Sequence, residues 1–198
     1  MEKENIKKKN VKPGIFKEYF RWPLIVLAVS LVLSFSFSFL SELALNGANL
    51  FIAIAVIVVF MFISIVTDAI GVAITAAVEV PFRAMAAKKV KGAKEGIILI
   101  NNADKVASIV ADILGDICGI LSGAAGAVVT AKLVDGIVDE FQVIFIASIV
   151  SAVIAAVIIF GKAMGKRIAL DSCDKIVLGL GKLVYIFTFG KLSSKNKN

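Results

Sequence analysis

The sequence has no histidine, two cysteines and three prolines, and only 19% of its residues are charged. Because the two cysteines stand alone, outside any Cys-x-x-Cys spacing, the chain lacks the ligands of zinc sites, haem attachment and disulfide scaffolds. A bound metal ion is therefore expected to be a hard cation held by oxygen atoms. The low charge excludes an ordinary soluble domain, in which about 25% of residues are charged.

Apolar residues dominate the composition of the chain. They make up 59% of the 198 residues, and the mean hydropathy is +0.94. Disordered chains are poor in such residues, so the composition indicates a membrane protein. The net charge of +7 sits at the edges of apolar stretches, which favours a membrane surface over nucleic acid as the partner of the basic residues.

Four apolar stretches predict an all-α integral membrane protein with about four transmembrane helices. They cover residues 24–45, 50–79, 105–131 and 141–165, and the turn at residues 46–49 joins the first two into a hairpin. The first span is rich in serine, and a cleaved signal peptide is the alternative interpretation of it. Its apolar core is long for a signal peptide and no clean Ala-x-Ala site follows, which favours a retained span.

Basic residues gather on one side of these spans. An arm at residues 1–23 and a stretch at 82–104 are both rich in lysine, and Lys162, Lys166 and Arg167 follow the last span. Positive segments remain in the cytosol, so four spans place both termini there, as in a bacterial-type inner membrane with an anionic inner leaflet.

The segments outside the spans are expected to lie on the inner membrane surface. Pro81 is expected to end the second helix, and residues 82–104 are predicted to form a basic juxtamembrane helical belt. Residues 168–191 alternate apolar and charged positions, which predicts an amphipathic C-terminal helix before a solvated basic tail at 192–198.

Three aspartates lie inside the predicted spans, where an ionisable side chain costs about 2.5–3.5 kcal/mol. Asp112 and Asp116 are four residues apart, which puts both carboxylates on one face of an α-helix. Asp68 lies on the preceding span, and at ~1.5 Å per residue all three are expected about 12–18 Å from the helix ends. The two helices are therefore predicted to bring their carboxylates to one level.

Carboxylate and hydroxyl oxygens at one level suit magnesium or calcium. The predicted metal ligands are Asp68, Asp112, Asp116, Ser64, Thr67 and Ser108. The alternative is that the aspartates form interhelical hydrogen bonds or pair with a nearby lysine.

Gly115, Gly119 and Gly123 recur every four residues beside the aspartate stripe. Such spacing lets helices approach closely, either within the subunit or at a dimer interface. The helix that packs against these glycines would also line the aspartate site. Cys118 and Cys173 are interpreted as structural residues. No arrangement for acid, base or nucleophilic catalysis is visible, so the chain is not expected to be an enzyme.

Four polar segments follow one another in a recognisable order. They are the run at residues 67–75, the turn Asn102-Ala103-Asp104-Lys105, the polar span Asp112-Ile113-Leu114-Gly115-Asp116 and Gly161-Lys162-Ala163-Met164-Gly165-Lys166. Their order resembles the transmembrane domain of the CorB/CorC and cyclin M (CNNM) magnesium transporter family. The resemblance covers about residues 51–187 by order more than by identity, and it implies a homodimer with a cytosolic belt that transports a divalent cation.

Two departures from the family pattern shape the functional hypotheses. Lys162 stands where the family has an acidic residue, and the family's nucleotide-binding CBS domains have no counterpart in this sequence. The leading hypothesis is transport or sensing of a divalent cation, Mg²⁺ first, with Lys162 as a counter-charge. The alternative is a non-transporting membrane scaffold or accessory subunit in which Lys162 neutralises the aspartates and the basic surface recruits anionic lipid or a protein partner.

Overall fold

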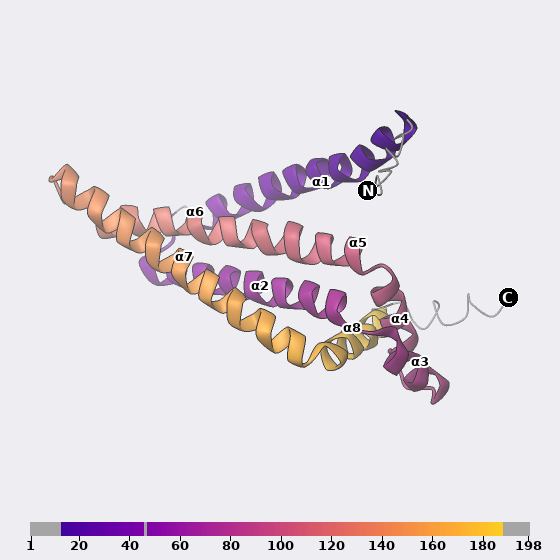
Figure 1. The fold of residues 1–198 in the computed structure, drawn as a ribbon. Helices are drawn as coiled ribbons and strands as arrows, with labels where there is room; N and C mark the ends of the chain where they lie inside the picture. The colour runs from indigo at the N-terminus through magenta and orange to yellow at the C-terminus, as the bar shows by residue number, and fades with distance from the viewer. Residues whose placement is uncertain (1–12, 46, 188–198) are drawn as a thin grey trace, which may run out of the picture.

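A computed structural model describes residues 13–45 and 47–187 of the chain. These residues form helices and connecting turns without any β-strand, which confirms the predicted all-α class (Figure 1). Among them, four helices are long and apolar enough to cross a membrane, as predicted. The predicted basic arm up to residue 12 and the tail beyond residue 187 lie outside the described residues.

The first two long helices are α1 (Pro13–Leu45) and α2 (Leu50–Ala76). Gly47 adopts a φ of +77° in the turn between them, and the Asn49 side chain caps α2 by accepting a hydrogen bond from the Ile52 amide at 3.0 Å. Two serines of α1, Ser30 and Ser36, are compatible with lipid because their hydroxyls bond back to their own helix. Ser36 Oγ, for example, donates to the Val32 carbonyl at 2.8 Å.

The boundary expected at Pro81 is wrong. Helix α2 ends at Ala76, and α3 (Glu79–Ala87) begins before the proline. Pro81 lies in the first turn of α3, where a residue without a backbone N–H is tolerated because that N–H has no partner within the helix.

Three short helices form what we call the belt: α3, α4 (Ala93–Asn101) and α8 (Cys173–Phe187). Phe82 of α3 is fully buried in a cluster that also contains Ile74 and Val177, so the belt is packed onto the end of α2. The Arg83 guanidinium lies 2.9 Å from Glu79, and its hydrogen bond lowers the pKa of that carboxyl below its usual value. The belt lies at the same end of the bundle as the first turns of α1 (Figure 1).

The third span is one rod built from three helical segments, α5 (Ala103–Ala107), η1 (Ser108–Gly115) and α6 (Asp116–Leu133). The middle segment, η1, is a π-helix, which has wider turns than an α-helix. The rod covers the predicted span at residues 105–131, but it is not the regular α-helix that was expected there.

The fourth long helix, α7 (Glu140–Asp171), extends beyond its predicted end at residue 165. The extra turns place Ala169, which is fully buried, in the same cluster as Val177. The C-terminal helix therefore begins at Cys173, after a break at Ser172, and not at residue 168 as predicted.

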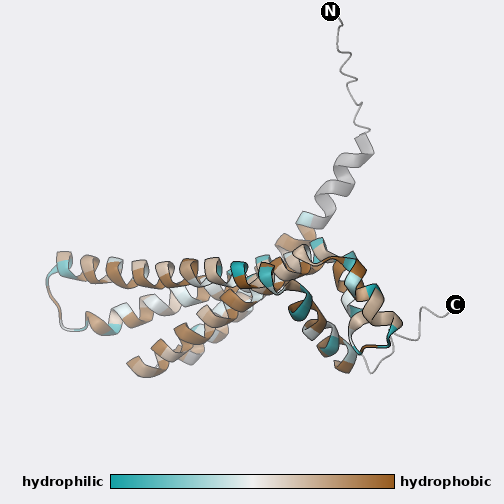
Figure 2. Cartoon of the chain, turned by 60° about the horizontal axis from the view of Figure 1, so that its bottom comes forward, coloured by the Kyte–Doolittle hydropathy of each residue, from teal (hydrophilic) through white to brown (hydrophobic). Residues whose placement is uncertain are grey.

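Helix α2 lies at the centre of the bundle, and both the rod and α7 pack against it. Helix α1 contacts the rod through Val26 and Leu33, which lie against Ile113, Ile117 and Leu121. The long helices expose hydrophobic residues on their outer surfaces, whereas hydrophilic residues gather near the turns and the belt (Figure 2). A soluble protein rarely exposes apolar surface on this scale, but lipid is a suitable solvent for it.

Candidate functional site

Three helices bring acidic and basic side chains together at one level of the bundle. Lys162 of α7 donates a hydrogen bond to Asp116 Oδ1 at 3.0 Å, and its Nζ lies 4.0 Å from Asp68 Oδ1 of α2. Lys166, one turn further along α7, has its Nζ 3.4 Å from Asp68 Oδ2. We call Asp68, Asp116, Lys162 and Lys166 the ion network.

The length of the uncharged helical segments locates this network near one edge of the bilayer. Residues 141–161 of α7 carry no charge and extend about 30 Å at ~1.5 Å per residue, the thickness of a typical hydrocarbon core. Residues 50–67 of α2 are also uncharged and extend about 27 Å. Both segments end at the ion network, so it is expected at the belt-side edge of the hydrocarbon and not at its centre.

The members of the network differ in exposure. The Asp68 side chain is 14% exposed and Lys162 21%, whereas Lys166 is 52% and Asp116 65% exposed. Asp68 Oδ2 is buried and accepts no hydrogen bond from the described residues, although Lys166 lies within ion-pair distance. Asp68 is therefore the carboxylate that depends most on the two lysines for its charge balance.

Glycines of α7 bring the lysines close to α2. Gly161 packs against the Ile65 side chain, and a Cβ at Gly165 would lie 3.4 Å from the Ala69 Cβ. Lys162 and Lys166 have the same four-residue spacing as these glycines, so both lysines lie along the packed edge of the helix. Lys162 was predicted to lie at the site and Lys166 was not, although the four-residue spacing between the two lysines places them on one edge of a helix.

Asp112 does not join the other two aspartates. It is exposed and lies in η1, whereas Asp116 begins α6. A spacing of four residues keeps the two carboxylates on a similar side of the rod, but Asp112 lies one turn nearer the belt and forms no ion pair with Lys162 or Lys166. Within residues 13–45 and 47–187, no three acidic or cysteine side chains are grouped so that they could hold a metal ion.

The predicted hydroxyl ligands are engaged with backbone. Ser64, which is fully buried, donates to the Gly115 carbonyl at 2.6 Å, and this bond joins α2 to the last residue of η1. Thr67 donates to the Ile63 carbonyl of its own helix at 2.8 Å. Ser108 is half-buried at the start of η1. The hydroxyls of Ser64 and Thr67 thus donate their hydrogen bonds to backbone carbonyls and stabilise the helices.

The predicted glycine strip divides into two parts. A Cβ at Gly115 would lie 3.0 Å from Thr67 Oγ1, and one at Gly119 would lie 3.4 Å from Ser64 Oγ, so both glycines pack against α2 within the subunit. A Cβ at Gly123 would meet nothing within 4 Å. The intrasubunit alternative therefore holds for the first two positions. Both cysteines are free thiols.

The architecture defines a multi-pass helical membrane protein with a polar belt at one end. No protein-family model matches the chain, and no curated protein or solved structure matches it. Its function is therefore argued from the ion network and the belt.

Proposed function

We propose that this protein is a non-transporting membrane scaffold or accessory subunit whose intramembrane aspartates are neutralised by Lys162 and Lys166. The observation that carries this proposal is the position of Lys162 Nζ, 3.0 Å from Asp116 and 4.0 Å from Asp68. The Lys162 ammonium group thus lies between the two carboxylates, in the position that a cation bridging them would need.

The charge balance of the network supports this proposal. Two carboxylates and two ammonium groups sum to zero, so the network has no excess negative charge to attract a divalent cation. A magnesium ion would also demand near-octahedral oxygen coordination, and it would have to displace Lys162 to bridge Asp68 and Asp116. The same network joins α2, α6 and α7, which suits a structural role.

The belt supplies the surface through which such a scaffold would act. Exposed basic residues lie on α3, on α8 and in the turn before α4: Arg83, Lys88, Lys89, Lys91, Lys175 and Lys182. Each basic residue near an anionic membrane surface contributes about 1 kcal/mol of attraction. We propose that the belt faces the cytosol, contacts the anionic inner leaflet and presents a docking surface to a protein partner.

The second candidate is a divalent-cation transporter or sensor, magnesium first, resembling the CorB/CorC transmembrane domain and forming a homodimer as that family does. One observation favours it: Asp68 Oδ2 is buried without a hydrogen bond from the described residues. In this candidate Lys162 is a counter-charge that leaves Asp68 and Asp116 when the cation enters.

Ion-dependent stability distinguishes the two candidates. The purified protein is heated with magnesium, calcium, manganese or sodium while helix content is followed by circular dichroism. A ligand at about 100 times its dissociation constant stabilises the folded state by about 2.7 kcal/mol. We expect no ion to stabilise the wild-type protein selectively, because the lysines already occupy the carboxylates.

Asp116→Asn and Asp112→Asn make a matched pair for this measurement, because only Asp116 belongs to the ion network. Stabilisation by magnesium that disappears in Asp116→Asn and persists in Asp112→Asn would contradict the scaffold proposal. It would establish a cation site at the network instead.

The native thiols test the proposed orientation. In a Cys118→Ala variant, Cys173 of the belt is expected to react with a membrane-impermeant maleimide only after the cells are permeabilised. Val138, which is 98% exposed in the loop between α6 and α7, provides the control. Its replacement by cysteine, in a chain without other cysteines, should react in intact cells, and the reverse pattern would show that the belt faces outward.

A further inference from the structure

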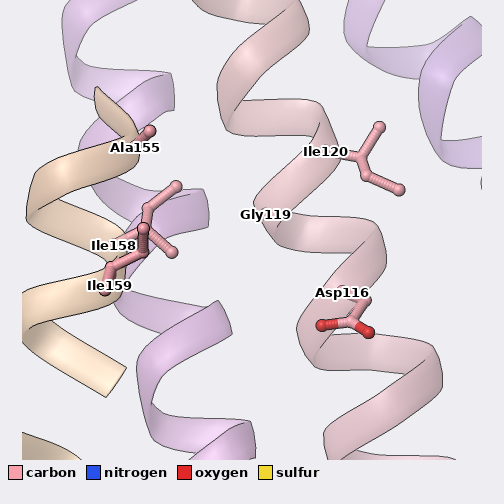
Figure 3. Close-up of a pocket in the computed structure, with 6 residues that line it drawn as sticks. All are labelled: Asp116, Gly119, Ile120, Ala155, Ile158 and Ile159. Atoms are coloured by element: carbon pink, nitrogen blue, oxygen red, sulfur yellow. The ribbon is translucent and has the colours of Figure 1, made fainter. Parts of the chain in front are cut away.

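An open groove lies between α6 and α7 on the outer surface of the bundle. It has a volume of about 470 Å³ and is lined by Asp116, Gly119, Ile120, Ala155, Ile158 and Ile159. Figure 3 shows Asp116 at one end of the groove, with Ile158 and Ile159 on the α7 side. Apart from the single carboxylate, the lining is entirely apolar.

A contact between the two helices flanks the groove at each end. At one end Lys162 of α7 binds Asp116 of α6, and at the other end Ile154 packs against Gly126. Between these contacts Gly119 has no side chain to fill the space. Helix α2 lies behind the groove, since its Ser64 is next to Gly119 of α6 and its Ile65 is next to Gly161 of α7.

The order of charge along the groove matches the order of charge in a membrane. Asp116 and Lys162 are expected at the edge of the hydrocarbon, and the other lining residues continue from that edge toward the bilayer centre. A molecule in the groove therefore meets charge at the headgroup level and hydrocarbon below it. A phospholipid has this arrangement, with a polar headgroup above an acyl chain.

We propose that this groove is a binding site for a phospholipid with a primary-amine headgroup, of the phosphatidylethanolamine type. Asp116 uses Oδ1 for Lys162 and is 65% exposed, so its carboxylate is open to an ammonium donor. The Lys162 ammonium, which is bound to Asp116, adds positive charge close to the level expected for the lipid phosphate. The acyl chain lies along Gly119, Ala155 and Ile158.

The headgroup chemistry separates this lipid from others. A primary ammonium donates hydrogen bonds to a carboxylate, whereas the quaternary ammonium of phosphatidylcholine has no N–H, and phosphatidylglycerol has no positive charge for Asp116. A second copy of this chain is a poorer occupant, because an apolar helix there would cover the exposed carboxylate. Helix α1 is already packed against Ile113 and Ile117 on the rod. The inference does not depend on the choice between scaffold and transporter.

Native mass spectrometry of the full chain, purified in detergent and titrated with lipids of identical acyl chains, tests the proposal. One phosphatidylethanolamine per chain is expected to bind about tenfold more tightly than phosphatidylcholine or phosphatidylglycerol, as one charge-assisted hydrogen bond would give. Ala155→Phe fills the groove and is expected to weaken binding about tenfold, the value of about 1.4 kcal/mol of lost contacts. Ile120→Trp fills it from the opposite wall and is expected to do the same.

Ala156→Phe is the matched control, because Ala156 is an exposed neighbour on α7 that does not line the groove. It should leave lipid binding unchanged, and circular dichroism verifies that all variants keep their helix content. Equal affinity for the three lipids, or equal loss in Ala155→Phe and Ala156→Phe, would overturn the proposal. A two-chain complex that Ala155→Phe dissociates would overturn it as well, by showing that the groove is an interface between copies.

Discussion

Replacing Lys162 by methionine is expected to lower the free energy of unfolding by about 3 kcal/mol. Removing one partner of a fully buried ion pair typically costs about 3–5 kcal/mol, and because Lys162 and Asp68 are only partly exposed while Asp116 is exposed, this site belongs at the lower limit of that range. Methionine keeps the unbranched apolar stem, so the change removes mainly the ammonium group. Chemical denaturation in detergent micelles, followed by circular dichroism, measures the difference.

The uncompensated charge on Asp68 is the reason for this large effect. Asp68 is 14% exposed, and after the substitution it retains only Lys166, whose side chain is 52% exposed. Adding Asp68→Asn to Lys162→Met should therefore recover much of the lost stability, since it removes the stranded carboxylate.

Lys175→Met provides the baseline for this comparison, because Lys175 is an exposed lysine on α8 away from the network. Surface substitutions of this kind change stability by about 0.5 kcal/mol or less. If Lys162→Met costs no more than Lys175→Met, the ion network contributes nothing to folding, and its proposed structural role is lost.

The membrane class and the number of long apolar helices were predictable because they depend only on composition and on the length of uncharged runs. Residues 50–67 and 141–161 show this plainly, since hydropathy locates them whichever way each helix is rotated. Helix ends were less predictable: α7 continues through Arg167 to Asp171 because Ala169 is buried against the belt, a tertiary contact that no local pattern reveals.

The site was predictable only in part, because it depends on helix rotation. Pairing of Asp68 and Asp116 with a lysine was one of two interpretations open from the sequence, and Lys162 was named as that lysine. Asp112 was assigned to the same site because a spacing of four residues places it on the same side of the helix as Asp116, but that spacing does not show which of the two meets the lysines of α7. Hydropathy carries no signal for the π-helical segment η1 or for the position of the α7 lysines beside Asp116, so both required the three-dimensional structure.

The contact between α4 and α8 was also missed, although glycines mark it. Gly92 begins α4 with a φ of +86°, a conformation that other residues rarely adopt, and its carbonyl oxygen lies where a Cβ on Gly181 would be. The glycines were visible in the sequence, but nothing local pairs two positions so far apart in the chain. Their backbone contact fixes how α8 is seated on the belt.

Gly181→Ala is therefore expected to destabilise the belt by about 3 kcal/mol, the upper part of the usual range for overpacking. The added methyl would overlap the Gly92 carbonyl oxygen and would lie 3.0 Å from the Gly96 amide nitrogen. Both neighbours are backbone atoms, which cannot rotate away as a side chain can, so α8 has to move off α4. Unfolding free energy and the rate of proteolysis within α8 measure the effect.

Gly179→Ala tests whether this effect comes from the contact or from the helix itself. Gly179 lies on the same helix, is exposed and has no atom within 4 Å of the position that a Cβ would occupy. Because alanine favours a helix over glycine by about 1 kcal/mol, this control should be neutral or stabilising. The two substitutions are chemically identical and only two residues apart, so opposite signs can arise only from the seating of α8 against α4. Similar effects at both positions would show that α8 does not pack on α4 through Gly181.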